Sequence, residues 1–110
     1  MDLFVYGTLM DDALVVELTG RSFRKEPARL PGYRKIMPEG DYPYIVPDAV
    51  QSVDGVVLCD VDDTALQAFD VYEDERLYLR REVTVIVAGD RRACLAYVRH
   101  PERIREPGGC

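Results

Sequence analysis

Apolar residues near the N-terminus follow first a strand pattern and then a helical one. Residues 2–6 contain a short apolar run of strand-forming side chains at Leu3, Phe4 and Val5. Residues 12–19 carry apolar side chains at helical spacing and follow the N-cap candidate Asp11. Gly20 comes next, in the position at which many helices end. The pattern therefore predicts a strand over residues 2–6 and a helix over residues 12–19, joined by a turn at Gly7.

Proline punctuates the middle of the chain and excludes long helices there. Five prolines stand between residues 23 and 47. Residues 28–33 and 44–46 have the composition of short strands or sheet edges, and residues 55–61 show a stronger strand pattern. The polar residues 62–64 form a cap cluster that opens a short helix. This second helix has apolar side chains at helical spacing: Ala65, Leu66, Phe69 and Tyr72.

The last third of the chain predicts a β-hairpin. Residues 82–87 and 93–98 are strand-like, and valine occupies every second position of the first run. Gly89 and Asp90 stand between them, and glycine first in a two-residue turn predicts a type II′ turn. The order of the elements predicts an α+β domain, with a small mixed, curled or barrel-like sheet and two short flanking helices.

Composition and charge narrow the class of protein. The 110 residues are 47% hydrophobic and 31% charged, which is typical of a globular domain. We expect one domain over residues 1–100 and a loose tail over residues 101–110. No apolar run approaches the ~20 residues of a membrane helix, and Asp2 argues against a secretory signal. A net charge of −6 argues against nucleic acid as the main partner. We therefore expect a cytoplasmic protein, and the sequence leaves its oligomeric state open.

The cysteines and acidic residues do not form a metal-binding pattern. Cys59, Cys94 and Cys110 are widely spaced, and we expect reduced thiols, with the first two acting as small core hydrophobes. An EF-hand loop that begins at Asp60 needs glycine at its sixth position, where Ala65 stands. We therefore expect no metal site.

Any acid–base chemistry must rest on a carboxylate, a tyrosine or a lysine, because His100 is the only histidine and lies near the tail. Glu73 stands out because it follows the apolar side chains of the second helix. A carboxylate among apolar groups has a raised pKa, which suits proton transfer. In isolation Glu73 also fits an ordinary solvated glutamate. In the same way, the turn at Gly7 fits either an anion-binding set of N–H groups or a plain connection.

Two segments far apart in the sequence carry a combination of motifs. Residues 4–10 read Phe-Val-Tyr-Gly-Thr-Leu-Met, and residues 69–73 read Phe-Asp-Val-Tyr-Glu, followed by Tyr78 and Arg80. In this order, and with further matches between them, these segments resemble the gamma-glutamylcyclotransferase-like family, in its AIG2-like, gamma-glutamylamine cyclotransferase branch. The resemblance covers residues 3–98.

The resemblance implies a small mixed barrel with flanking helices and a catalytic carboxylate at Glu73. Asp74 stands where the family commonly has glycine, a departure that bears on the rim of the pocket. Tyr78 fits either a hydroxyl beside the carboxylate or a partly buried sheet residue, and Arg80 is expected to pair with an acidic neighbour. The resemblance also implies a substrate-binding loop that consists of Tyr6, Gly7, Thr8 and Leu9.

The activity implied is that of a cofactor-independent gamma-glutamyl cyclotransferase, a transferase or lyase by reaction class. The α-amine of a gamma-glutamyl amine attacks its own side-chain carbonyl, which releases 5-oxoproline and a free amine. The nucleophile lies within the substrate, so the reaction requires no covalent enzyme intermediate and no metal. Two alternatives stay open: a non-catalytic small-molecule binding domain, and removal of a gamma-glutamyl protecting group from a biosynthetic intermediate.

Overall fold

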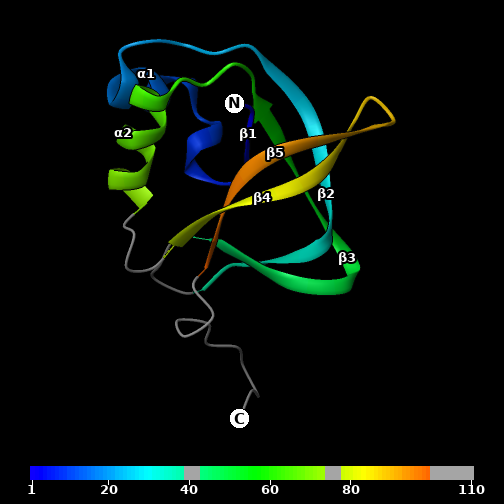
Figure 1. Ribbon diagram of the computed structural model, residues 1–110. Coiled ribbons are helices and arrows are strands. Elements are labelled where there is room, and N and C mark those ends of the chain that lie inside the picture. Colours follow the sequence, from blue (N-terminus) through cyan, green and yellow to red (C-terminus); the bar gives the residue numbers. More distant parts are fainter. Residues whose placement is uncertain (39–42, 74–77, 100–110) are drawn as a thin grey trace.

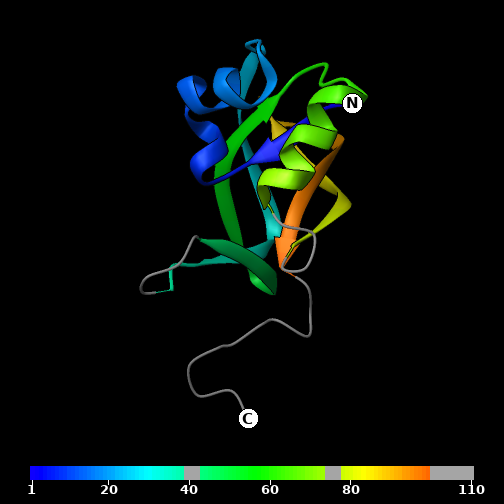
Figure 2. The same ribbon diagram turned by 90° about the vertical axis from the view of Figure 1, so that its left-hand side faces the viewer.

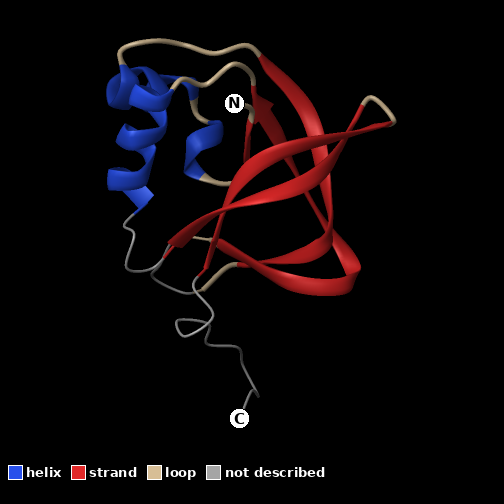
Figure 3. Ribbon diagram, viewed as in Figure 1, coloured by secondary structure: helices blue, strands red, loops and turns tan. Residues whose placement is uncertain are grey.

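The computed structural model describes residues 1–38, 43–73 and 78–99. Within this part of the chain, five strands form a closed barrel in the order β1-β3-β2-β4-β5, and the helices gather on one side of it (Figures 1 and 3). The strands are β1 (Leu3–Val5), β2 (Lys25–Ile36), β3 (Tyr44–Leu58), β4 (Tyr78–Val87) and β5 (Asp90–Arg99). The helices are the 3-10 helix η1 (Thr8–Met10), α1 (Asp12–Thr19) and α2 (Asp63–Glu73).

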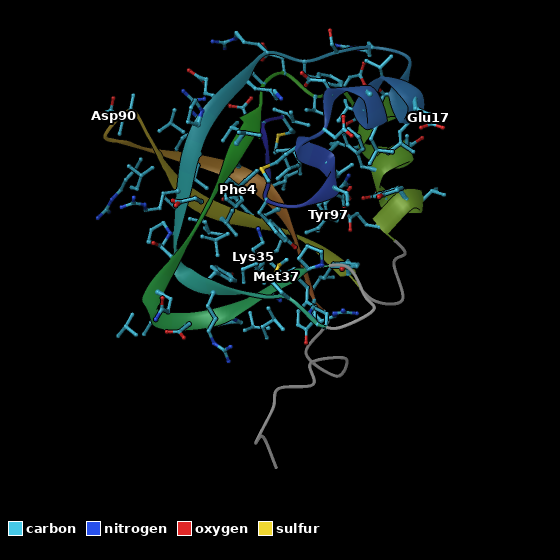
Figure 4. The ribbon with its side chains drawn as sticks, turned by 180° about the vertical axis from the view of Figure 1, so that it is seen from behind. Phe4, Glu17, Lys35, Met37, Asp90 and Tyr97 are labelled. Carbon is cyan, nitrogen blue, oxygen red and sulfur yellow. The ribbon has the colours of Figure 1, made fainter. Side chains whose placement is uncertain are left out.

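The short strand β1 closes the barrel. It pairs antiparallel with β3 and parallel with β5, so the sheet is mixed as predicted. Leu3, Phe4 and Val5 are all buried, which explains why this strand is a continuous apolar run rather than an alternating one. Phe4 points into the barrel (Figure 4), and its two neighbours point outward to the helices.

Two hydrophobic clusters result from this arrangement. The first fills the barrel, and the valines of β4 at positions 83, 85 and 87 belong to it, as their alternation predicts. The second lies between the barrel and the helices, where α2 buries Ala65, Leu66 and Phe69. Figure 2 shows α1 and α2 lying together against the barrel. The second cluster therefore holds α2 at the site described below.

The ends of both long helices follow local sequence signals. The Asp11 side chain accepts a hydrogen bond from the Ala13 N–H at 2.9 Å, and Gly20 adopts a left-handed φ of 78° after the last turn of α1. The Asp62 side chain accepts from the Ala65 N–H at 2.9 Å at the start of α2. The predictions of a helix over residues 12–19 and of a cap cluster at residues 62–64 are confirmed.

The middle strands are longer than the sequence predicts. The runs predicted at residues 44–46 and 55–61 belong to one strand, β3, which continues between them and ends at Leu58. Residues 48–52 are largely exposed and lack an alternating pattern. Residues 48–51 lie between two stretches paired with β2, because Ser52 pairs with Pro31 and Pro47 pairs with Tyr33. A register shift between Pro31 and Tyr33 marks a bulge, where Gly32 has a φ of +85°.

The predicted turn of the last hairpin is wrong. Val87 pairs with Asp90, so the two central residues of the turn are Ala88 and Gly89. Their φ angles are 52° and 85°, and two positive values belong to a type I′ turn rather than type II′. Type I′ geometry matches the right-handed twist of the flanking strands, although alanine is uncommon at a positive φ.

Several expectations lie outside the described residues: the tail over residues 101–110, with Cys110, and the side chains of Asp74 and His100. The single domain over residues 1–100 therefore stays a prediction. Cys59 and Cys94 are buried free thiols, as predicted. No helix in residues 1–38, 43–73 and 78–99 is long and apolar enough to cross a membrane.

Gly55 provides a test of how β1 closes the barrel. A Cβ at this position would overlap the Val5 carbonyl oxygen and would lie 2.8 Å from Phe4 Cζ. We expect Gly55→Ala to lower the free energy of unfolding by about 3 kcal/mol, because the backbone of β1 has no room to move. Chemical denaturation measures this loss, and the neighbouring exposed change Asp54→Ala is the control. A Gly55→Ala protein as stable as the wild type would contradict the packing described here.

Candidate active site

The end of α2 lies over the outer face of the β4–β5 hairpin. Asp70 and Glu73 are three residues apart and therefore share one face of the helix. On the hairpin, Arg80 stands opposite Tyr97 in the ladder, and Tyr78 is two residues away on the same face. These five side chains line a cavity of about 210 Å³. Its wall is polar, since it consists of two carboxyls, a guanidinium and two phenol hydroxyls.

Asp70 is the centre of a polar network in this cavity. The Tyr97 hydroxyl donates a hydrogen bond to Asp70 Oδ1 at 2.6 Å, and an Arg80 terminal nitrogen lies 3.3 Å from Asp70 Oδ2. Arg80 therefore pairs with an acidic neighbour, as predicted. The Tyr97 carbonyl accepts a hydrogen bond from the Tyr6 hydroxyl at 2.6 Å. Hydrogen bonds thus connect the end of β1 to the face of α2 that carries Glu73.

Burial changes the acidity of Glu73. Loss of water raises the pKa of its carboxyl from the ordinary value of 4.5 to about 7. Burial, followed by the charge of Glu73, also raises the pKa of the Tyr6 hydroxyl, so this phenol stays protonated. The cavity around Glu73 is polar, so burial rather than an apolar lining raises its pKa, and the carboxyl can exchange a proton near neutral pH.

The loop after β1 approaches the same end of α2. The Thr8 hydroxyl and the Tyr72 hydroxyl are 2.9 Å apart and hydrogen-bonded. Lys35 of β2 donates from Nζ to the Tyr6 carbonyl at 2.9 Å (Figure 4). A Cβ on Gly7 would lie 3.3 Å from Pro43 Cγ, so the backbone passes closely between two segments here. The backbone after β1 is therefore in contact with Lys35 of β2 at Tyr6 and with Pro43 at Gly7.

A second hollow lies beside the cavity. It is an open groove of about 690 Å³, and its wall includes Gly7, Thr8, the α1 residue Glu17 and the ring of Tyr72. Tyr72 faces this groove while its neighbour Glu73 faces the cavity. The two hollows therefore flank the last turn of α2.

The residues predicted as a site fall into three positions. Glu73 and Tyr78 line the cavity, and Gly7 and Thr8 line the groove. Tyr6 is buried in the barrel with its hydroxyl directed to β5. The Leu9 side chain is buried between the barrel and the helices, so its backbone N–H is the group it can offer to a ligand. Tyr78 has a buried ring that lines the cavity, and its hydroxyl donates a hydrogen bond to the Pro43 carbonyl at 3.3 Å.

Sequence reasoning missed three polar residues at or beside the cavity. Asp70 belongs to the quoted Phe-Asp-Val-Tyr-Glu segment, which was a usable signal. No sequence signal identified Tyr97, because its position beside the cavity depends on the register of the β4–β5 hairpin. Arg99 is buried, with its guanidinium carbon 4.0 Å from the centre of the Tyr44 ring and 5.0 Å from that of Tyr78. It places a positive charge behind the cavity wall.

The described residues 1–38, 43–73 and 78–99 contain no group of three or more His, Cys, Asp or Glu side chains that could hold a metal ion. The site offers carboxyls, hydroxyls, a guanidinium and backbone amides.

The raised pKa of Glu73 makes protein stability depend on pH. Between pH 4.5 and about 7 the unfolded chain ionises this carboxyl while the folded chain holds its proton. The free energy of unfolding should therefore fall as pH rises through this window. We expect Glu73→Gln to remove that decrease, so that the variant gains stability relative to the wild type up to pH 7.

Denaturation curves at several pH values measure the difference between the two proteins. Glu17→Gln removes an exposed glutamate of α1 and is the control, because a solvated carboxyl keeps its water on folding. A constant difference between wild type and Glu73→Gln from pH 4.5 to 7 would show that Glu73 is solvated.

Comparison with known proteins identifies the family. Residues 3–109 match the family described as gamma-glutamyl cyclotransferase, AIG2-like. A gamma-glutamylcyclotransferase and putative RNase of Methanocaldococcus jannaschii is 35% identical over 98 residues, which are 88% of this chain and 44% of that protein. AIG2-like protein C of Arabidopsis thaliana is 37% identical over 87 residues, which are 78% of this chain and 50% of the plant protein. The chain thus spans about half the length of these curated relatives.

A solved structure shares the fold. The solution structure of an Arabidopsis thaliana protein has a TM-score of 0.81 with this chain at 27% identity, and the match covers 96% of this chain and 74% of that one. The α+β barrel with two flanking helices is therefore the predicted architecture. With the family match extending over residues 3–109, the chain belongs to the gamma-glutamyl cyclotransferase, AIG2-like family.

Proposed function

We propose that this protein is a cofactor-independent gamma-glutamyl cyclotransferase that converts a gamma-glutamyl amine into 5-oxoproline and a free amine. The observation that carries the proposal is the position of Glu73, a carboxyl in a polar cavity with a pKa raised to about 7. Family membership and the cyclotransferase names of relatives support the same chemistry.

Glu73 moves two protons in this reaction. As a carboxylate it first takes a proton from the α-ammonium of the substrate, and the resulting amine attacks the γ-carbonyl carbon. The new carbon–nitrogen bond closes a five-membered ring and leaves a tetrahedral oxyanion. As the bond to the leaving amine breaks, Glu73 returns the proton to the departing nitrogen. The carboxylate formed again then takes the extra proton of the ring nitrogen and passes it to solvent, which leaves the neutral lactam. A carboxyl with a pKa near 7 suits both steps, because it neither holds nor releases the proton too strongly.

Backbone amides of the loop after β1 would bind negative charge. The first N–H groups of a 3-10 helix have no partner inside the helix, and η1 begins at Thr8, directly after Gly7. We propose that N–H groups of Gly7, Thr8 and Leu9 bind either the developing oxyanion or the substrate α-carboxylate. The leaving amine would then extend into the open groove beside Tyr72.

The two alternatives differ in what they require of Glu73. A non-catalytic binding domain has no need of a carboxyl that titrates near neutral pH, so the raised pKa favours an enzyme. Removal of a gamma-glutamyl protecting group uses the same steps and differs in the amine that leaves.

Glu73→Gln tests the catalytic role. Glutamine keeps the size and hydrogen bonding of the side chain but cannot carry the proton, so we expect kcat to fall about 10²–10⁴-fold while binding persists. In the wild type, kcat/KM should rise with pH through about 7, because Glu73 must be ionised to accept a proton. Release of 5-oxoproline from a panel of gamma-glutamyl amines measures both effects.

Glu82→Gln is the matched control, since Glu82 is an exposed glutamate of β4 that lines neither the cavity nor the groove. Equal kcat in Glu73→Gln and wild type would exclude Glu73 as the proton carrier. If the wild type bound gamma-glutamyl amines without turning over any of them, the protein would be a binding domain.

A further inference from the structure

The cavity beneath α2 has the charge pattern of an amino-acid head group. It presents the carboxyls of Asp70 and Glu73 on the helix side and the guanidinium of Arg80 on the sheet side. A gamma-glutamyl group carries an ammonium and a carboxylate on one carbon atom. Both charges must be paired when they leave water, because an unpaired buried charge is costly. A mixed set of acids and one base matches this requirement.

We propose that Arg80 binds the α-carboxylate of the gamma-glutamyl group, and that Asp70 and Tyr97 position Arg80 for this. The inference rests on the proposed function in one respect, since it takes the bound ligand to be a gamma-glutamyl compound. If Glu73 accepts the proton of the α-ammonium, the carboxylate on the same carbon must find a cation nearby. Among the described residues that line this cavity, Arg80 carries the positive charge.

The geometry of Arg80 suits this role. A guanidinium has five N–H donors in a planar fork that matches a carboxylate. Asp70 lies 3.3 Å from one terminal nitrogen, so donors remain for a second anion. The Arg80 side chain is 34% exposed, which leaves it accessible from the cavity and from solvent.

Asp70 is itself fixed, and this makes it a positioning residue. The Tyr97 hydroxyl donates to Asp70 Oδ1 at 2.6 Å, while Oδ2 faces Arg80. Tyr97 also stands directly opposite Arg80 in the β4–β5 ladder. The helix, the side chain of Tyr97 and the strand pairing therefore set the direction of the fork before any ligand arrives.

The assignment decides which charge the loop amides receive. With the α-carboxylate at Arg80, the N–H groups at residues 7–9 are left for the oxyanion of the γ-carbonyl. The amino-acid end of the substrate then lies in the cavity, and the reacting carbonyl points toward the loop. This orientation requires the leaving amine to face the groove at Tyr72.

The test compares two substrates that differ only in the α-carboxylate. One is a gamma-glutamyl amide, and the other is the 4-aminobutyryl amide of the same amine, which cyclises to 2-pyrrolidinone. We expect Arg80→Gln to raise KM for the gamma-glutamyl amide about 10- to 100-fold, the range for a charged hydrogen bond, and to leave KM for the 4-aminobutyryl amide unchanged. Arg81→Gln is the control, because Arg81 is exposed and sits on the alternate face of β4.

Binding to the Glu73→Gln protein separates this inference from the proposed function. Calorimetry with the same two compounds needs no turnover, so the carboxylate-dependent loss in Arg80→Gln can be measured even if no 5-oxoproline forms. Equal weakening of both compounds would overturn the inference and give Arg80 a purely structural role. If Arg80→Gln does not fold, Arg80→Lys decides, because retained charge should preserve part of the preference for the gamma-glutamyl compound. Equal wild-type affinity for both compounds would also overturn the inference.

Discussion

The position of Tyr97 between the barrel and α2 is the constraint on which the site depends. Its carbonyl accepts the Tyr6 hydroxyl, and its own hydroxyl donates to Asp70. These two bonds of 2.6 Å lie on opposite sides of one strand, so they connect the inside of the barrel to the helix outside it. Around this connection, docking of α2 on the barrel leaves Glu73 half-buried at the cavity. The altered acidity of the carboxyl is therefore a result of helix docking rather than of a nearby charge.

Local signals made part of this arrangement predictable. Asp11 and Gly20 mark the ends of α1 through their own backbone geometry, and the apolar spacing along α2 identifies its buried face. The position of Glu73 can be predicted from that face, because a residue one helical turn beyond Phe69 must lie near the same surface. Such inferences need only a few consecutive residues, and they hold because capping and helical periodicity are short-range effects.

The sheet residues that line the cavity with Glu73 could not be predicted from such local signals. With the turn placed at Gly89-Asp90, the ladder shifts by two residues and Arg80 faces Arg99 instead of Tyr97. The true turn requires alanine at a positive φ, which local preference argues against. The exposed middle of β3 escaped prediction for a related reason, since it has no alternating pattern of its own and lies between two stretches that pair with β2. Pairing between strands therefore determined the hairpin register and the length of β3, which the local sequence pattern could not predict.

The parallel pairing of β1 with β5 also determines the order of assembly. Leu3 and Phe4 stand opposite Leu95 and Ala96, so the barrel cannot close before nearly all of its strands have formed. Contacts between such distant parts of a chain slow folding, because a large loop must be ordered before they form. A nascent chain would carry β1, with the loop that follows it, as an unpaired apolar segment until β3 and β5 emerge. Chaperone binding and proteolysis during synthesis should therefore concentrate on its first ten residues.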